Sequence, residues 1–199
     1  MDIELEIAKN TEYKRLSKLS PVGKVLIYGT GGLAIGVSVI CIPFVSPAFR
    51  KFCLPYVPAT TEQLLGVCHA LKGRSGRLLD VGSGDGRIVF TAAKLGFKAV
   101  GVELNPILVL YSRISALLNK QYNETRFYRK NLWTFNLLPY NNIVIFGVEQ
   151  MMMEFEKKLL QEASDGTVVV ACRFPLPNMV PIETIGHGVD TVWKYEIKK

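Results

Sequence analysis

The chain has 199 residues, which leaves room for one domain and an appendage, and its 49% hydrophobic and 21% charged residues suffice for a packed core. Its net charge of +7 suits anionic surroundings such as a lipid surface, but its lysines and arginines are scattered, so we expect no nucleic-acid partner. Four cysteines without a C-x-x-C pair, and only two histidines, argue against a zinc site.

The front of the chain differs from the rest, because residues 25–45 form an apolar run of 21 residues without a charge. As a helix the run would be roughly 31 Å long, about the thickness of the hydrocarbon core of a bilayer. The alternative is a buried core helix, but a small domain has little interior to hide one. We therefore expect a transmembrane anchor over 25–45, preceded by a polar and basic segment over 1–24. Basic residues flank the run on both sides, so charge leaves the topology open.

Residues 46–76 form a linker that ends in an N-terminal helix. The stretch SPAFRKFCLPYVPAT carries three prolines, and Thr60 or Thr61 can then cap a helix from Glu62 to about Leu71. The remaining residues, 77–199, are expected to form the main domain.

Strands and helices alternate along this domain. We expect strands at 77–81, 98–103, 125–129, 142–146 and 167–172, helices at 87–95, 106–119 and 151–163, and a closing hairpin near 182–185 and 191–197. The alternation predicts an α/β fold with a right-handed, mostly parallel sheet.

The helix at 151–163 shows a helical pattern of apolar residues. One face carries Met152, Phe155, Leu159, Leu160 and Ala163. We expect Glu154 and Lys158 to form a pair on the outer face.

The most informative motif is LLDVGSGDGR, in which the strand bearing Asp80 runs into the glycine turn Gly82-Ser83-Gly84, with Gly86 two residues on. The next strand ends in Glu103. A dinucleotide fingerprint, G-x-G-x-x-G, would need a small residue where Arg87 stands, so a nucleotide-dependent oxidoreductase is disfavoured. With a carboxylate two residues before the first glycine, the motif instead resembles the first motif of seven-strand S-adenosylmethionine (SAM) methyltransferases.

The chemistry of SAM fits these residue types. Asp80 can hold the amino group of the cofactor directly or through water, and Glu103 can accept both ribose hydroxyls. Glycines at 82, 84 and 86 allow the sharp turn and the close approach of the ligand. Either half of the pattern alone could belong to any α/β protein, whereas both in register favour a SAM site.

Ligands of such sheets bind beyond the carboxyl ends of the strands. That edge should also carry Asn131 and the turn at 147–150. Asn131 is placed to accept from the adenine amino group, and the alternative is a plain turn residue.

With these residues laid out, the chain resembles a family of mitochondrial, membrane-anchored lysine methyltransferases. The resemblance covers about residues 42–196, and its most specific blocks are PYVPATTEQ, FGVEQMM and ACRFPLP. One branch of the family modifies the ATP synthase c subunit and another the adenine nucleotide translocase, and the blocks are closer to the first. Relatives carry Asp where Asn131 stands, and Pro where Glu149 stands. We therefore place Gln150, rather than Glu149, in the site.

The resemblance implies a Rossmann-like, seven-strand class I SAM methyltransferase with an N-terminal transmembrane segment. It implies SAM as cofactor, the ATP synthase c subunit as substrate, trimethylation of a lysine, and a place in the mitochondrial inner membrane. Thr61 and Gln63 of the PYVPATTEQ block join the expected cofactor-binding residues.

The chemistry of lysine methylation suggests where the substrate lies. A lysine must be neutral to attack, which costs roughly 4–5 kcal/mol near pH 7, and a dry apolar channel lowers that cost. We assign the channel walls to Phe146, Gln150, Phe174 and Trp193, with core packing as the alternative for each aromatic residue. Alternative functions are a methyltransferase for the translocase, for another membrane protein or for a small molecule, and a non-catalytic SAM-fold assembly factor.

Overall fold

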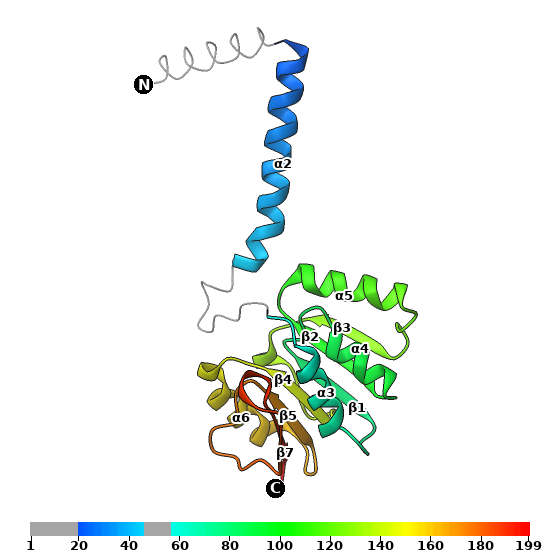
Figure 1. The fold of residues 1–199 in the computed structure, drawn as a ribbon, viewed down its shortest axis with the longest axis vertical. Coiled ribbons are helices and arrows are strands. Elements are labelled where there is room, and N and C mark those ends of the chain that lie inside the picture. Colours follow the sequence, from blue (N-terminus) through cyan, green and yellow to red (C-terminus); the bar gives the residue numbers. More distant parts are fainter. Residues whose placement is uncertain (1–19, 46–56) are drawn as a thin grey trace. The chain divides into compact units, whose positions relative to one another are not determined.

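The computed structural model describes residues 20–45 and 57–199, in two compact units that divide after Ile42 (Figure 1). The first unit holds most of helix α2, Pro21–Val45, which starts four residues before the expected Val25. Ser20 explains the earlier start, because its hydroxyl accepts the Gly23 N–H at 3.1 Å and a proline fits the first helical turn. The helix is long and apolar enough to cross a membrane, and its large apolar side chains between Val22 and Ile42 are exposed.

The second unit contains a seven-stranded sheet in the order β3-β2-β1-β4-β5-β7-β6. All neighbouring strands are parallel except those that pair with β7, which runs antiparallel to β5 and β6. This topology confirms the predicted α/β fold of the seven-strand methyltransferase class. The strands are β1 Arg77–Val81, β2 Lys98–Glu103, β3 Thr125–Arg129, β4 Asn142–Phe146, β5 Val168–Cys172, β6 Glu183–Ile185 and β7 Val192–Glu196.

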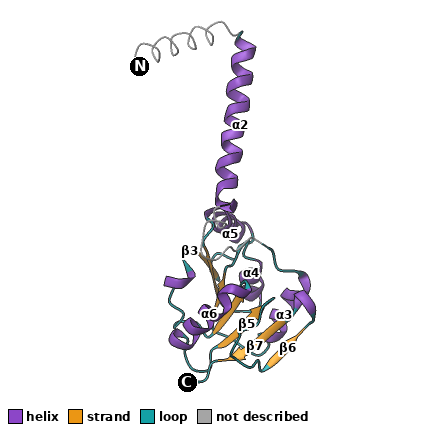
Figure 2. Ribbon diagram, turned by 90° about the vertical axis from the view of Figure 1, so that its left-hand side faces the viewer, coloured by secondary structure: helices purple, strands orange, loops and turns teal. Residues whose placement is uncertain are grey.

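Helices cover both faces of the sheet, and each face has its own apolar core (Figure 2). One core lies under α3, α4 and α5, and the other lies under α6. Because side chains alternate along a strand, Leu78 joins the first core while Leu79 joins the second. The helices are α3 Thr61–Ala70, α4 Arg87–Lys94, α5 Pro106–Leu118 and α6 Glu149–Glu162, with short 3-10 turns η2 Leu132–Thr134 and η3 Gly188–Asp190.

Helix α6 differs from its prediction. It begins at Glu149, two residues before the expected Met151. The prediction that Lys158 lies on the outer face was wrong, and Leu160, predicted on the apolar face, is not buried. Leu160 is 45% exposed, whereas Lys158 is buried and its ammonium group bonds to Glu162 and to the carbonyl of Trp133. The loop after β3 lies against this side of α6. Lys158 can therefore be buried here, because Glu162 and the Trp133 carbonyl satisfy its ammonium group.

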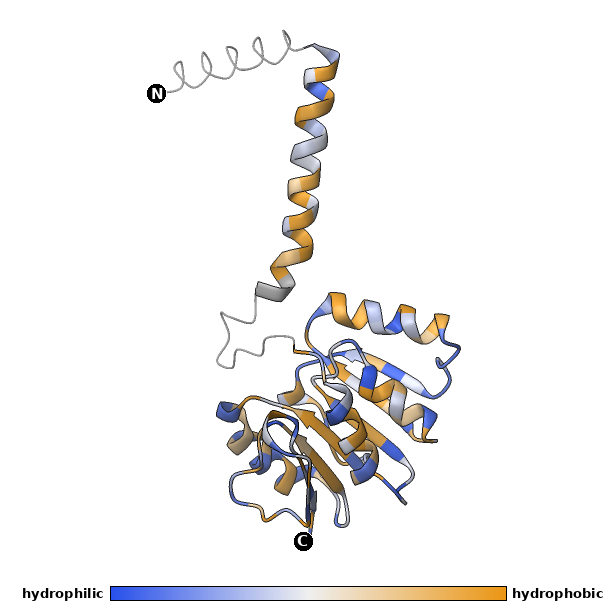
Figure 3. Cartoon of the chain, viewed as in Figure 1, coloured by the Kyte–Doolittle hydropathy of each residue, from blue (hydrophilic) through white to orange (hydrophobic). Residues whose placement is uncertain are grey.

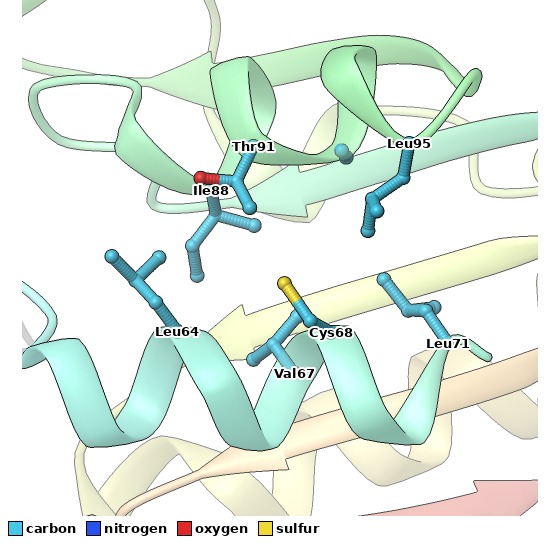
Figure 4. Close-up of a pocket in the computed structure, with 8 residues that line it drawn as sticks. Leu64, Val67, Cys68, Leu71, Ile88, Thr91 and Leu95 are labelled. Carbon is cyan, nitrogen blue, oxygen red and sulfur yellow. The ribbon is translucent and has the colours of Figure 1, made fainter.

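Helices α3 and α4 meet along an apolar seam (Figure 4). Their facing side chains leave no space for a water molecule. The seam therefore fastens α3 to α4. Its lining comprises Leu64, Val67, Cys68, Leu71, Ile88, Thr91, Ala92 and Leu95.

Candidate functional site

Asp80 is the penultimate residue of β1, the strand between β2 and β4. Its side chain is buried, and its Oδ1 has no hydrogen-bond partner among the described residues. Burial, and then the charges of Glu103 and Asp85, raise the pKa of Asp80 to about 8. The Ser83 hydroxyl is likewise buried without a partner in the described part of the chain. Two orphaned polar groups only three residues apart indicate a place built for a polar ligand.

The glycine turn holds its shape through left-handed backbone angles, with φ values of +77° at Gly82, +52° at Gly84 and +85° at Gly86. The turn lies tightly against β2, because the N–H groups of residues 82 and 83 both donate to the Val102 carbonyl. Gly101 makes this approach possible, since a Cβ there would lie 2.6 Å from Ser83 Oγ. The isolated glycine inside the second strand is the sequence signal for this contact.

Glu103 is held differently from Asp80. Its Oε1 accepts the N–H groups of Leu104 and Asn105, both at 2.7 Å, and its Oε2 accepts the Gly84 N–H at 3.2 Å. These three donors stabilise the carboxylate and fix its direction. Oε2 keeps a free lone-pair direction, so Glu103 can still accept a hydroxyl.

An arginine clasp, unrecognised in the sequence, closes the other side of the turn. Arg87 forms a salt bridge to Asp85 at 2.6 Å and donates to the Ala59 carbonyl at 2.6 Å. One residue on, Thr60 donates to Asp190 at 2.7 Å. The clasp ties the segment before α3 to the glycine turn. The contact between Asp85 and Arg87 has a local sequence signal, an acid two residues before an arginine at the start of a helix. The contacts to Ala59 and Asp190 have no such signal.

Three other predicted cofactor residues have structural roles. Thr61 is exposed as the first residue of α3, and Thr60 is the cap. Gln63 is buried, completes the capping box with Thr60 and donates to the Val189 carbonyl at 2.8 Å. Asn131 is exposed and caps η2, because its Oδ1 accepts the Trp133 N–H at 3.1 Å. Their contact with a cofactor stays a prediction.

The predicted channel residues lie at the carboxyl ends of β4 and β5 or close to them. Phe146 is half-buried and ends β4, Gln150 is exposed in the first turn of α6, and Phe174 lies two residues beyond β5. The aromatic residues do not share one core: Phe146 packs on the side of α3 and α4, whereas Phe174 and Trp193 pack on the side of α6. Trp193 pairs with Ala171 and so lies one position inside this edge.

Between these walls the end of β5 carries an inert thiol and a strained residue. Cys172 pairs with Phe146 and is fully buried, and burial, followed by the charge of Asp80, raises the pKa of its thiol well above the ordinary value. Arg173 follows with φ of +72°, a left-handed conformation that is uncommon outside glycine. Its N–H donates to the Thr191 carbonyl at 3.2 Å, which secures the turn.

The loop after β5 is fastened on the side of α6 by two polar contacts. The Leu176 N–H donates to the Tyr195 hydroxyl at 2.9 Å. Buried Glu156 accepts both the backbone N–H and the side-chain amide of Asn178, at 2.9 and 3.0 Å. Phe174 therefore sits at the base of an ordered loop.

The residues of this edge fit SAM. A cationic amino group would give Asp80 its missing partner, and the ordered Glu103 carboxylate can accept one ribose hydroxyl at Oε2, not the expected pair. The glycines at 82, 84 and 86 place no Cβ atom in the way of the ligand. Among the described residues no cluster of His, Cys, Asp or Glu could hold a metal ion.

Comparisons with known proteins agree with this geometry. The family model of the ANTKMT methyltransferase domain matches residues 80–183, and that of the N-terminal domain of the ATP synthase c-subunit lysine N-methyltransferases matches residues 16–50. Over 194 residues the chain is 50% identical to the ATP synthase c-subunit lysine N-methyltransferase of Xenopus laevis, covering 98% of this chain and 84% of the relative.

Two further matches are more distant. The adenine nucleotide translocase lysine N-methyltransferase of Mus musculus is 36% identical over 177 residues, which cover 86% of this chain and 77% of the relative. Among solved structures, an RNA methyltransferase from Salinibacter ruber in complex with S-adenosyl-L-homocysteine aligns with a TM-score of 0.65 at 26% identity. The alignment covers 72% of this chain and 95% of that one.

Proposed function

The chain belongs to the ATP synthase c-subunit lysine N-methyltransferase family, and from that premise we propose that it trimethylates a lysine of the ATP synthase c subunit. It is a SAM-dependent protein-lysine N-methyltransferase. The observation that carries the choice of substrate is the 50% identity to the Xenopus laevis enzyme across 98% of the chain. The match of residues 16–50 to the N-terminal domain of the same enzymes supports it.

The glycine edge of the sheet holds the cofactor, whose sulfonium supplies the methyl group. In this proposal Asp80 accepts the cofactor ammonium, and Ser83 donates its hydroxyl, which has no partner in the described structure. Glu103 accepts a ribose hydroxyl through the remaining acceptor direction of Oε2, and Asn131 accepts from the adenine amino group. Binding of a cation also stabilises the ionised form of Asp80, whose pKa burial raises to about 8.

The neighbouring edge at β4 and β5 receives the lysine. Phe146 and Phe174 exclude water from its side chain, and this desolvation lowers the pKa of the amine. The Gln150 amide oxygen accepts a hydrogen bond from the neutral amine and so orients its lone pair toward the methyl group. Trp193 supports this wall from one position inside the sheet. Alignment of the two reactants then supplies much of the rate.

Helix α2 anchors the enzyme in the mitochondrial inner membrane. The proposal rests on its length, its apolar composition and the exposure of its side chains. We propose an anchor over 25–45 after a basic segment over 1–24, and a catalytic domain over 77–199 joined to it by 46–76. An anchored catalyst searches at high effective concentration for a substrate held in the same bilayer.

Intact-mass spectrometry of the ATP synthase c subunit tests the proposal. We expect three methyl groups in normal cells, the bare mass after deletion of the gene, and recovery with the wild-type chain but not with Asp80→Ala at equal protein level. An unchanged c subunit after deletion would overturn the substrate assignment. Full recovery with the Asp80 variant would contradict the assigned cofactor site.

A second substrate, the adenine nucleotide translocase, is supported by the 36% identity to its methyltransferase. The same cell lines discriminate between the two. If deletion removes methyl groups from the translocase and leaves the c subunit unchanged, the second assignment replaces the first.

A further inference from the structure

Helix α5 exposes a continuous apolar stripe to solvent. At helical spacing its residues fall on one side of the helix, and their exposure ranges from 48% for Ile114 to 78% for Leu118. Figure 3 colours much of α5 as hydrophobic. We call this surface the α5 stripe, and it consists of Leu110, Tyr111, Ile114, Leu117 and Leu118.

The opposite side of α5 packs against the rest of the domain. Val109 and Ala116 are buried in the core under α4 and α5, and buried Ser112 donates to the Gly84 carbonyl at 3.3 Å. The one charged residue of the helix, Arg113, donates twice to the Phe127 carbonyl. The α5 stripe is therefore an apolar surface left over after α5 has packed, and no described side chain covers it.

Basic residues are frequent in and after α5 along the chain. Residues 106–135, which span α5, the following turn and edge strand β3, contain five basic residues and one acid. Lys120, Arg129 and Lys130 among them are exposed. Exposed apolar side chains in a basic segment are the pattern of surfaces that lie on anionic lipid.

The sequence also limits the distance between the domain and the anchor. Eleven residues, 46–56, separate the end of α2 from the described part of the domain. A chain of that length spans at most about 40 Å. A domain of this size has a radius of gyration of about 15 Å, so the tether allows it to touch the bilayer.

We propose that the α5 stripe docks on the anionic surface of the bilayer that holds α2. The inference rests on the membrane anchor proposed above. Ile114 and its neighbours enter the interface between headgroups and acyl chains, while basic side chains of the segment contact lipid phosphates. Because Asn105 caps α5 and its N–H donates to Glu103, docking holds the cofactor edge of the sheet close to the lipid surface. The docked site would then lie at the level of a lysine on a short loop of a membrane protein, close to the lipid surface.

Site-specific photocrosslinking in the full chain tests the docking. The photoreactive amino acid p-benzoylphenylalanine replaces Ile114, and the chain is reconstituted into phosphatidylcholine vesicles with or without cardiolipin. Leu160 on α6 is the matched control, because its exposure of 45% is close to the 48% of Ile114 and it lies on the other face of the sheet. Leu117 provides a second position on the stripe.

We expect lipid adducts at Ile114 and Leu117 but not at Leu160. Cardiolipin should increase the adduct about fivefold, the gain expected for one basic side chain at an anionic surface. Adducts to a second copy of the chain or to added ATP synthase c subunit, in place of lipid, would overturn the proposal and assign the stripe to a protein partner. Flotation of the vesicles separates the two inferences: a chain that floats without lipid adducts overturns docking alone, and a chain that does not float overturns the anchor as well.

Discussion

The two halves of the catalytic edge are built on opposite principles. At the end of β1 and in the turn that follows, two polar groups lack a partner, because Asp80 Oδ1 and Ser83 Oγ are buried without one among the described residues. At β4 and β5 the walls are aromatic, and the polar groups of the adjoining loop are already satisfied by Tyr195 and Glu156. In the proposed function a cationic cofactor completes the first half. The second half would gain from staying neutral and dry, since we propose that it receives an uncharged amine.

The largest expected effect comes from crowding the cofactor half. A Cβ at Gly86 would lie 2.8 Å from the Phe127 ring at a φ of +85°. Left-handed strain and overpacking together should lower the free energy of unfolding of Gly86→Ala by roughly 2–5 kcal/mol and weaken SAM binding. Urea unfolding and calorimetric titration measure the two effects.

Gly96→Ala is the matched control for this prediction. Gly96 has a φ of +91°, but a Cβ there would meet no atom within 4 Å. We expect only the strain of about 1–2 kcal/mol and unchanged SAM affinity. Equal losses in the two variants would show that the close approach to Phe127 contributes nothing.

Asp80→Asn should separate function from stability in the same half. Loss of a charged partner for the cofactor ammonium weakens SAM binding by about 10- to 100-fold. Near pH 9, where Asp80 is ionised, the ligand-free variant should unfold at higher urea than the wild type, because a buried unpaired charge has been removed. Asp165→Asn, at an exposed position, should change neither quantity. A variant that loses stability would mean that Asp80 has a partner in the ligand-free fold.

The same contrast explains what the sequence could and could not predict. The cofactor half is local in sequence: Asp80, the glycines and Glu103 belong to two adjacent strands, so spacing alone predicts their meeting. The arginine clasp escaped prediction because Arg87 meets Ala59 across 28 positions and Thr60 meets Asp190 across 130. Neither partner is marked by a local pattern.

The substrate half shows a different limit. Strand bounds were predicted closely, yet the face that each aromatic residue occupies follows from the alternation along its strand and from the order of strands. Phe146 and Trp193 thus pack on opposite faces. In α6 the apolar period was recognised, but Lys158 is buried because distant groups satisfy its charge, which hydropathy does not encode.

Tyr195→Phe tests whether the substrate half depends on its satisfied polar groups. The ring volume stays, but the buried Leu176 N–H loses its acceptor, which should cost about 1–3 kcal/mol of unfolding free energy. SAM affinity should stay unchanged while KM for the protein substrate rises, because the loop that carries Phe174 loosens. Tyr122→Phe, at an exposed ring, is the control. A variant with weaker SAM binding and normal KM would contradict the division of the edge into two halves.

A dependence on pH should belong to the cofactor half alone. In the ligand-free fold the pKa of Asp80 is raised from 3.8 to about 8, so between these values the folded protein keeps a proton that the unfolded chain has lost. The contribution of Asp80 to stability therefore falls as pH rises through this window and levels off above it.

SAM binding should depend on pH through the same group, because the cofactor ammonium selects the ionised Asp80 carboxylate. SAM affinity should accordingly rise by up to about tenfold per pH unit below pH 8 and then reach a plateau, with release of one proton on binding. Calorimetry in buffers of different ionisation enthalpy measures that proton directly. Asp80→Asn should abolish the proton release, whereas Tyr195→Phe should leave it intact, and release that survives in the Asp80 variant would assign the proton to another group.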